Sequence, residues 1–413
     1  MKFFKVTFWA SISTGTSMVC GLITTKYIAV IIGPEGMAYV GQFLNATVVI
    51  LLLATGACAT GIVKYLSQHK DETKRLSIFS NAMILSGACL LITSLVVIFF
   101  SGILSKNFFN TKSFRDVFLI YGIFMIFPTF NTLASAVLNG LQQIRQMAII
   151  SISSSCLYVV AVIIAAKFFG LKGVLLANLI SAFFTFFLYL FLLKKQGLFI
   201  NKKLLSAYDP SALKLLLGYS LMSIVSGIIA PSLQLFVRTK LLHNFNANTA
   251  GLWQANMRLS DSYLNFIYTV IGMYYLPRLS ELFEISQIRR EIKLAFLRIL
   301  PVVILITITI WVFRFYIVKI FLTGNFMDML VLLKWQLIGD VIKIASWILG
   351  YLMVAKAMKK TFISTELIFS VTYVLLNYWF INNYGMVGTV YAFTLNYSLY
   401  LICLTILFRK YIF

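Results

Sequence analysis

The sequence has few of the residues that most enzymes use for catalysis. Its 413 residues include two His, five Cys and 12 Asp and Glu, and charged residues make up only 11% of the chain. A soluble domain is about one quarter charged, so this composition excludes an ordinary soluble protein. The chain also lacks a nucleophile–base set, a zinc-ligand spacing, a phosphate loop and a nucleotide fingerprint. The sequence therefore predicts no catalytic residue, no metal site and no cofactor.

Apolar residues are abundant instead: 61% of the chain is hydrophobic and the mean hydropathy is +0.93. Apolar runs of about 20 residues, long enough to cross about 30 Å of hydrocarbon, recur about a dozen times. We place these spans near residues 7–32, 37–66, 76–105, 117–140, 147–169, 171–193, 212–242, 251–275, 293–322, 328–357, 362–381 and 385–408. The predicted fold class is all-α, a polytopic membrane protein with 12 transmembrane helices.

The basic residues indicate the topology of the chain. The formal net charge is +23, and with the N-terminus inside, most of the 35 Lys and Arg fall on the cytoplasmic side of these spans. This asymmetry follows the positive-inside rule and predicts a multi-pass protein with both termini in the cytoplasm. The charge is thereby explained by topology and by attraction to anionic membrane lipids, and we expect no nucleic-acid partner.

A long internal repeat divides the chain. The segment at residues 170–177 (GLKGVLLA) opens the sixth span, and the segment at 385–392 (GMVGTVYA) opens the twelfth. We therefore expect an N-terminal six-helix bundle at 1–193, a cytoplasmic linker at 194–211 and a C-terminal six-helix bundle at 212–413. Parallel repeats of this kind usually bracket a central pathway.

Two polar stripes run along predicted helices in the second half of the chain. The first consists of Gln254, Arg258, Asp261 and Asn265, and the second of Gln336, Asp340, Lys343 and Trp347. Both follow the spacing i, i+4, i+7 and i+11, which places each set on one helix face. Ionisable groups at this depth normally face a bundle interior or a wet cavity. We predict that the stripes line a substrate-binding cavity.

Neighbouring charges within each stripe allow two interpretations. Arg258 can pair with Asp261, and Asp340 with Lys343, because each pair is about one helical turn apart. Such pairs can lock helix packing, or their cations can meet an anionic ligand that is released when a carboxylate titrates. Under the second interpretation Asp261 and Asp340 are candidates for coupling to a proton or sodium gradient.

Three further polar residues occupy related positions in the two halves. Gln42 corresponds to Gln254, and Lys26 to Arg238, at an offset of 212 residues. We include Gln42, Lys26 and Arg238 in the predicted cavity, although the two cations can equally extend to the outer membrane interface.

One charged pair follows the eighth span. Arg278 and Glu281 come directly after Pro277, where this span leaves the membrane on the cytoplasmic side. The pair is either a cytoplasmic gate or an ordinary solvated ion pair.

Several segments resemble a known family. Residues 252–254, 260–264 and 275–280 resemble the eighth helix of Wzx-type flippases, residues 335–343, 350–351 and 355–357 resemble the tenth, and residues 32–36 with Gln42 resemble the first external turn. The resemblance runs nearly end to end and is most specific at residues 335–343. One departure is that Ala46 and Val49 stand where the repeat would place Arg258 and Asp261, so a symmetric binding site is not expected.

The resemblance implies the polysaccharide-transport branch of the multidrug/oligosaccharidyl-lipid/polysaccharide exporter superfamily. Such proteins have two six-helix bundles in a V around a cationic cavity. They move undecaprenyl-diphosphate-linked O-antigen or enterobacterial common antigen units across the bacterial inner membrane by alternating access. An O-antigen polymerase and a chain-length regulator are the protein partners implied.

Two functions other than a flippase are also compatible with parts of the sequence. A multidrug exporter of the same architecture would normally use cavity acids for cationic drugs, whereas the deep cations here equal or outnumber the acids. A membrane polymerase or ligase of lipid-linked glycans would need a large external loop with catalytic residues, and the sequence shows none.

Overall fold

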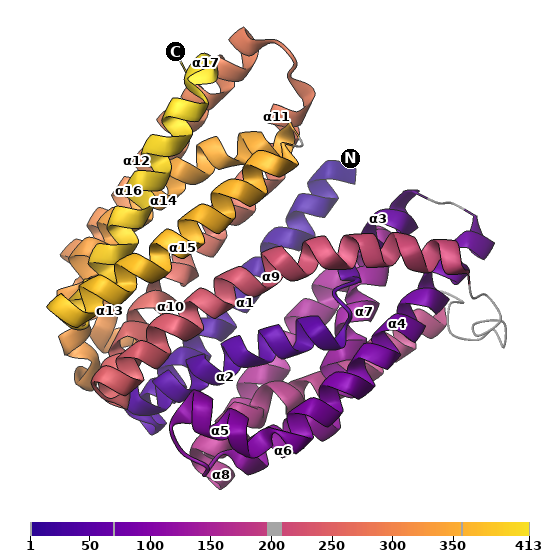
Figure 1. Ribbon diagram of the computed structural model, residues 1–413, viewed down its shortest axis with the longest axis horizontal. Coiled ribbons are helices and arrows are strands. Elements are labelled where there is room, and N and C mark those ends of the chain that lie inside the picture. Colours follow the sequence, from indigo (N-terminus) through magenta and orange to yellow (C-terminus); the bar gives the residue numbers. More distant parts are fainter. Residues whose placement is uncertain (1, 69–70, 196–208, 357, 413) are drawn as a thin grey trace. The chain divides into compact units, whose positions relative to one another are not determined.

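The structure of the protein, a computed structural model, describes residues 2–68, 71–195, 209–356 and 358–412. Every regular element in these ranges is a helix (Figure 1). By their contacts the residues group into two compact units. The first comprises Met1–Ile32 and Tyr39–Leu235, and the second Gly33–Ala38 and Phe236–Phe413. Most of the expected linker at 194–211 lies outside the described residues, and the bundle boundaries stay a prediction.

The first unit is built from eight described helices and the beginning of a ninth. They are α1 (Lys2–Ile31), α2 (Gly33–Ala54), α3 (Ala59–Gln68), α4 (Glu72–Phe99), α5 (Ser101–Phe109), α6 (Arg115–Phe124), α7 (Ile126–Gly140), α8 (Ile144–Lys195) and the start of α9 (Pro210–Asn244). α1 and α7 pack against α8, and α3 packs against α7. Fully buried residues such as Phe118, Val137 and Val162 form the core.

The second unit holds the end of α9 and the remaining helices. They are α10 (Ala247–Val270), a π-helical turn (Ile271–Tyr275), α11 (Leu276–Glu281), α12 (Ile285–Val312), α13 (Arg314–Phe321), a 3₁₀ turn (Gly324–Met329), α14 (Leu330–Ala355), α15 (Lys359–Tyr384), α16 (Val387–Leu407) and α17 (Arg409–Ile412). α14 packs against α10, α12 and α16, and α15 packs along α16 (Figure 1). Asn246 begins α10 by accepting a 2.8 Å hydrogen bond from the Thr249 backbone N–H, as an N-cap does.

Each predicted span coincides with a helix or with consecutive helices. By length and hydropathy, seven described helices can cross a membrane, or eight if the bent pair α6 and α7 is one span. One of these seven is α8, whose 52 residues contain the predicted fifth and sixth spans on either side of a kink at Gly170. Large apolar side chains such as Phe99, Phe169 and Leu305 remain exposed, as expected for helices that face lipid.

The repeated glycine motif has the same backbone geometry in both units. Gly170 has φ 55° and ψ −137°, and Gly385 has φ 64° and ψ −143°. Positive φ of this kind is accessible to glycine and rare for other residues. Three residues later, a Cβ on Gly173 would strike the carbonyl oxygen of Ala165, and a Cβ on Gly388 would strike that of Phe380. The two glycines thus let consecutive helices turn and pack closely, and the shared geometry agrees with an internal duplication.

Gly388→Ala should destabilise the protein because the added methyl group meets the Phe380 backbone. Overpacking of this kind costs about 1–3 kcal/mol, so the thermal unfolding midpoint of the detergent-purified protein should fall. Gly350→Ala is the matched control, since the nearest atom to its Cβ is the Tyr400 hydroxyl at 3.6 Å. Equal midpoints for the two variants would contradict the close approach.

Candidate functional site

A chain of buried hydrogen bonds joins α10 to α14 in the second unit. The Asn256 Nδ2 donates to Gln336 Oε1 at 3.2 Å, and the Gln336 Nε2 donates to Asp340 Oδ1 at 3.0 Å. The Tyr263 hydroxyl donates to the other carboxylate oxygen of Asp340. Gln336 is 1% exposed, and Asn256 and Asp340 are 0% exposed. Both oxygens of a carboxylate inside an apolar helix are therefore satisfied, as burial of that charge requires.

Lys343 lies one turn from Asp340 on α14 and is surrounded by aromatic rings. Its Nζ is 5.6–5.8 Å from the ring centroids of Tyr268 on α10, Trp347 on α14, and Phe393 and Tyr397 on α16. A cation within about 6 Å of an aromatic face is attracted by the ring quadrupole. Asp261 and Asp340 also attract this ammonium. The surroundings hold a positive charge within a membrane helix.

Two arginines of the second unit come from α9 and α10. The Arg238 Nε donates to Gln254 Oε1 at 3.1 Å, and its guanidinium lies 5.5 Å from the centre of the Trp253 ring. Arg238 is 0% exposed, whereas Arg258 is partly exposed. The Arg258 guanidinium is near enough to repel that of Arg238 and to attract Asp261. Among described residues, Arg258 has no acidic partner within 4.0 Å.

The structure brings most of the predicted stripe residues of the second half into one region, with a different pairing from the expected one. Neither Arg258–Asp261 nor Asp340–Lys343 is among the ion pairs within 4.0 Å that the described residues form. The oxygens of Asp340 are instead occupied by Gln336 and Tyr263. The interpretation of two ion pairs that lock the helices is thus wrong. Neutral donors, not Lys343, bind the oxygens of Asp340.

The other predicted residues differ in exposure and in the unit to which they belong. Asn265 is exposed at the end of the first stripe. Gln42, which is 0% exposed, and Lys26, which is partly buried, belong to the first unit. Arg278 pairs with Glu281 at 3.5 Å and with Glu291 at 3.9 Å, and the side chains of Arg278 and Glu281 are 49% and 70% exposed. This exposure favours the solvated ion pair over a gate.

Sequence reasoning missed two partners on α10. Asn256 and Tyr263 lie on a face of the helix beside the charged stripe and point toward α14 through the hydrogen bonds described above. Their spacing of i and i+7 places them on one face. Asn256 and Tyr263 do not fall at the i, i+4, i+7 and i+11 positions of the charged stripe, so the stripe pattern did not select them.

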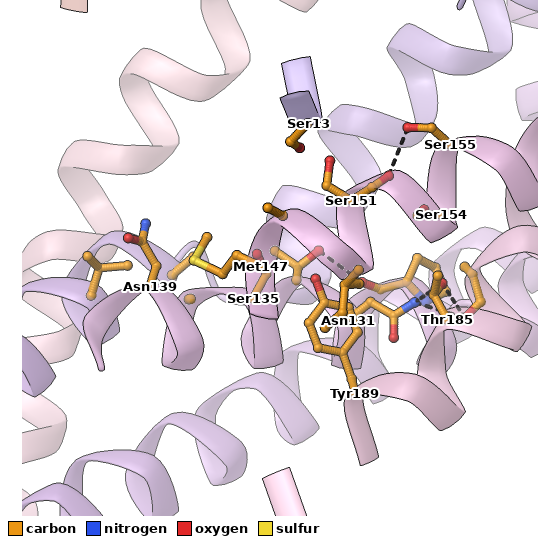
Figure 2. A pocket seen from close by; sticks show the side chains of 18 of the residues that line it. Ser13, Asn131, Ser135, Asn139, Met147, Ser151, Ser154, Ser155, Thr185 and Tyr189 are labelled. Carbon is orange, nitrogen blue, oxygen red and sulfur yellow. Dashed lines mark hydrogen bonds between the residues drawn. The ribbon is translucent and has the colours of Figure 1, made fainter. Parts of the chain in front are cut away.

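Sequence reasoning also missed a polar cavity in the first unit. A cavity of about 1130 Å³ is bounded by α1, α3, α7 and both parts of α8. Figure 2 shows Asn131, Ser135 and Asn139 of α7 together with serines of α8 at this cavity. The three α7 residues recur at i, i+4 and i+8, which is the signal that could have revealed them.

Comparison with solved structures establishes the fold of the protein. The inward-facing conformation of a multidrug resistance MATE family transporter of the MOP superfamily matches with a TM-score of 0.78 and 16% identity, covering 97% of this chain and 94% of that one. The lipid II flippase MurJ in an inward closed conformation matches with a TM-score of 0.76 and 15% identity, covering 98% and 87%. The predicted all-helical exporter fold is confirmed, and the chain is a multi-pass membrane protein.

Comparison of sequences then identifies the family. Residues 3–283, more than half of the chain, match the family described as polysaccharide biosynthesis protein, and the chain belongs to that family. It is also 26% identical over 403 residues to the lipid III flippase of Escherichia coli (strain K12), which covers 97% of this chain and 96% of the relative. The lipid III flippase of Shigella flexneri gives the same values. The prediction of a transporter and not an enzyme is thereby confirmed.

Tyr263→Phe should destabilise the protein because it leaves one oxygen of the buried Asp340 carboxylate without its donor. A hydrogen bond to a charged group contributes about 1.5–3 kcal/mol, so the unfolding midpoint in detergent should drop. Tyr384→Phe, at an exposed tyrosine of α15, should leave the midpoint unchanged. A midpoint for Tyr263→Phe equal to that of the control would mean that the hydroxyl does not support Asp340.

Proposed function

We propose that this protein is a flippase for lipid-linked oligosaccharides in the bacterial inner membrane. Its substrate would be an undecaprenyl-diphosphate-linked repeat unit, such as an O-antigen or enterobacterial common antigen unit, moved from the cytoplasmic to the periplasmic leaflet. The family membership and the full-length likeness to lipid III flippases support this proposal. The excess of Lys and Arg in loops on one side supports an orientation with both termini in the cytoplasm.

The observation that carries the proposal is that Arg258, inside a predicted span of the second unit, is partly exposed and has no acidic partner within 4.0 Å among the described residues. A cation at that depth without a close counter-ion is stabilised when an anion binds beside it. Arginine suits phosphate oxygens because its planar fork donates two parallel hydrogen bonds. A diphosphate supplies the required charge, and Lys343 adds a further cation in the same unit.

The charge of this site also separates the flippase from a multidrug exporter. The likeness to MATE transporters concerns the fold alone, at 16% identity. A pocket for cationic drugs needs carboxylates that are open to the ligand and not already balanced by cations. Asp340 is buried and has both oxygens occupied, and Asp261, although partly exposed, interacts electrostatically with Lys343 and Arg258. The partly exposed Arg258 instead favours an anionic headgroup.

Between the two candidate coupling residues, the surroundings favour Asp261. Asp340 accepts hydrogen bonds from Gln336 and Tyr263 and is closed to solvent. Asp261 is partly exposed and interacts electrostatically with Lys343 and Arg258. A carboxylate that must bind and release a proton or sodium ion needs access to water. We therefore propose Asp261 as the coupling group and Asp340 as a structural one.

Arg258→Ala should reduce flipping at least tenfold because the headgroup loses a charge-assisted contact of about 1.5–3 kcal/mol. The measurement is recovery of surface polysaccharide in a bacterial strain that lacks its own flippase, normalised to the amount of protein in the membrane. Arg258→Lys should recover only part of the activity, since lysine lacks the fork. Arg314→Gln, outside the network on α13, is the matched control. Full activity of Arg258→Ala would refute this headgroup site.

Asp261→Asn should make the residual transport independent of an ion gradient. The measurement is flipping in proteoliposomes with and without an imposed proton or sodium gradient. Asp340→Asn should instead lower the stability of the protein, and its remaining transport should still depend on the ion gradient. If Asp261→Asn responds to both gradients as the unaltered protein does, Asp261 is not the coupling group.

A further inference from the structure

The cavity of the first unit is large for a membrane helix bundle. Its volume of about 1130 Å³ lies just above the range of about 300–1,000 Å³ found for ligand pockets. A single metal ion or water molecule would leave most of it empty. Its size therefore fits an organic ligand of several rings.

The lining of the cavity is nearly neutral and mixes apolar side chains with many hydroxyl and amide groups. These polar groups come from four helices, for example Ser13 of α1, Thr60 of α3, Asn139 of α7 and Asn178 of α8. Lys64 is the one charged residue among those that line the cavity, and no carboxylate is among them. The lining thus differs from the charged network of the second unit.

Several of these polar groups are available to a ligand. Among the described residues, the Ser13, Asn139 and Asn178 side chains donate or accept no hydrogen bond, and Asn139 and Asn178 are exposed. Asn131 uses its Nδ2 to donate to the Ala182 carbonyl at 2.8 Å and to Thr185 Oγ1 at 3.0 Å. Its Oδ1 is left without a partner in the described structure (Figure 2).

This chemistry excludes two kinds of occupant. A cation site needs oxygen ligands with negative charge, and the lining has no Asp or Glu. An acyl chain would cover hydroxyl and amide groups such as those of Asn131, Asn139 and Asn178 without offering them hydrogen bonds, at a free-energy cost for each group. A ligand that carries many hydroxyl groups satisfies the lining and loses little by leaving water.

We propose that this cavity is a glycan-binding subsite that receives sugar rings of the transported molecule through Asn139, Asn178 and the neighbouring hydroxyls of α7 and α8. The inference rests on the proposed function, and it adds a second site, neutral and in the first unit, to the cationic headgroup site in the second. The neutral hydrogen-bonding groups of this cavity then select the glycan, and the cations of the second unit select for the diphosphate.

Binding to the full-length protein in lipid nanodiscs tests this assignment. The two probes are undecaprenyl diphosphate without sugar and the same lipid with an attached trisaccharide. The unaltered protein should bind the glycosylated probe more tightly than the bare one. Asn139→Ala and Asn178→Ala should each weaken binding of the glycosylated probe about threefold to tenfold, the loss expected for a neutral hydrogen bond. Neither should change binding of the bare lipid.

Ser153→Ala is the matched control, because Ser153 lies on α8 between lining serines and does not line the cavity. Unchanged affinity of Asn139→Ala and Asn178→Ala for the glycosylated probe would overturn the subsite. Equal affinity of the unaltered protein for the two probes would overturn it as well. Arg258→Ala should weaken binding of both probes. Failure of the glycosylated probe to bind the unaltered protein would instead refute the proposed flippase function.

Discussion

The second unit depends on the cost of placing charge inside a membrane helix. Asp340 is fully buried in α14, and an ionised carboxylate without partners at that depth would be strongly unfavourable. Gln336 and Tyr263 offset this cost by donating to both of its oxygens, and Asn256 extends the hydrogen bonds to α10. Because the partners come from two helices, the requirement to satisfy one carboxylate also fixes how α10 packs on α14.

Much of the fold follows from the sequence because span length and hydropathy are local properties. The predicted spans coincide with helices, and the repeated GxxG motif correctly marks equivalent turns at Gly170 and Gly385.

The site is harder to predict. Helical spacing makes Asp340 and Lys343 look like a pair, but it does not reveal that Tyr263, 77 residues away, donates to the carboxylate. Neutral stripes such as Asn131, Ser135 and Asn139 escape notice for a related reason: each residue is unremarkable alone, and only tertiary packing gathers them around one cavity.

The two units share the same glycine-dependent helix contact but differ in the polar residues at corresponding positions. Gly173 and Gly388 permit the same close helix approach, yet Ala46 and Val49 occupy the positions that correspond to Arg258 and Asp261. A side chain at either glycine would strike neighbouring backbone atoms, so glycine is retained at both positions. Polar positions are free of this steric constraint and can differ between the two units.

The π-helical turn at Ile271–Tyr275 has a consequence for motion. It directly follows α10, whose upper part is tied to α14 by the Tyr263–Asp340 hydrogen bond. Wide turns of this kind are sites where helices bend. Here, however, the Tyr275 hydroxyl of the turn donates to the Ile348 carbonyl of α14 at 3.2 Å, and α11 also packs on α14. The wide turn is therefore held in place, and α10, the turn and α11 are all anchored to one helix.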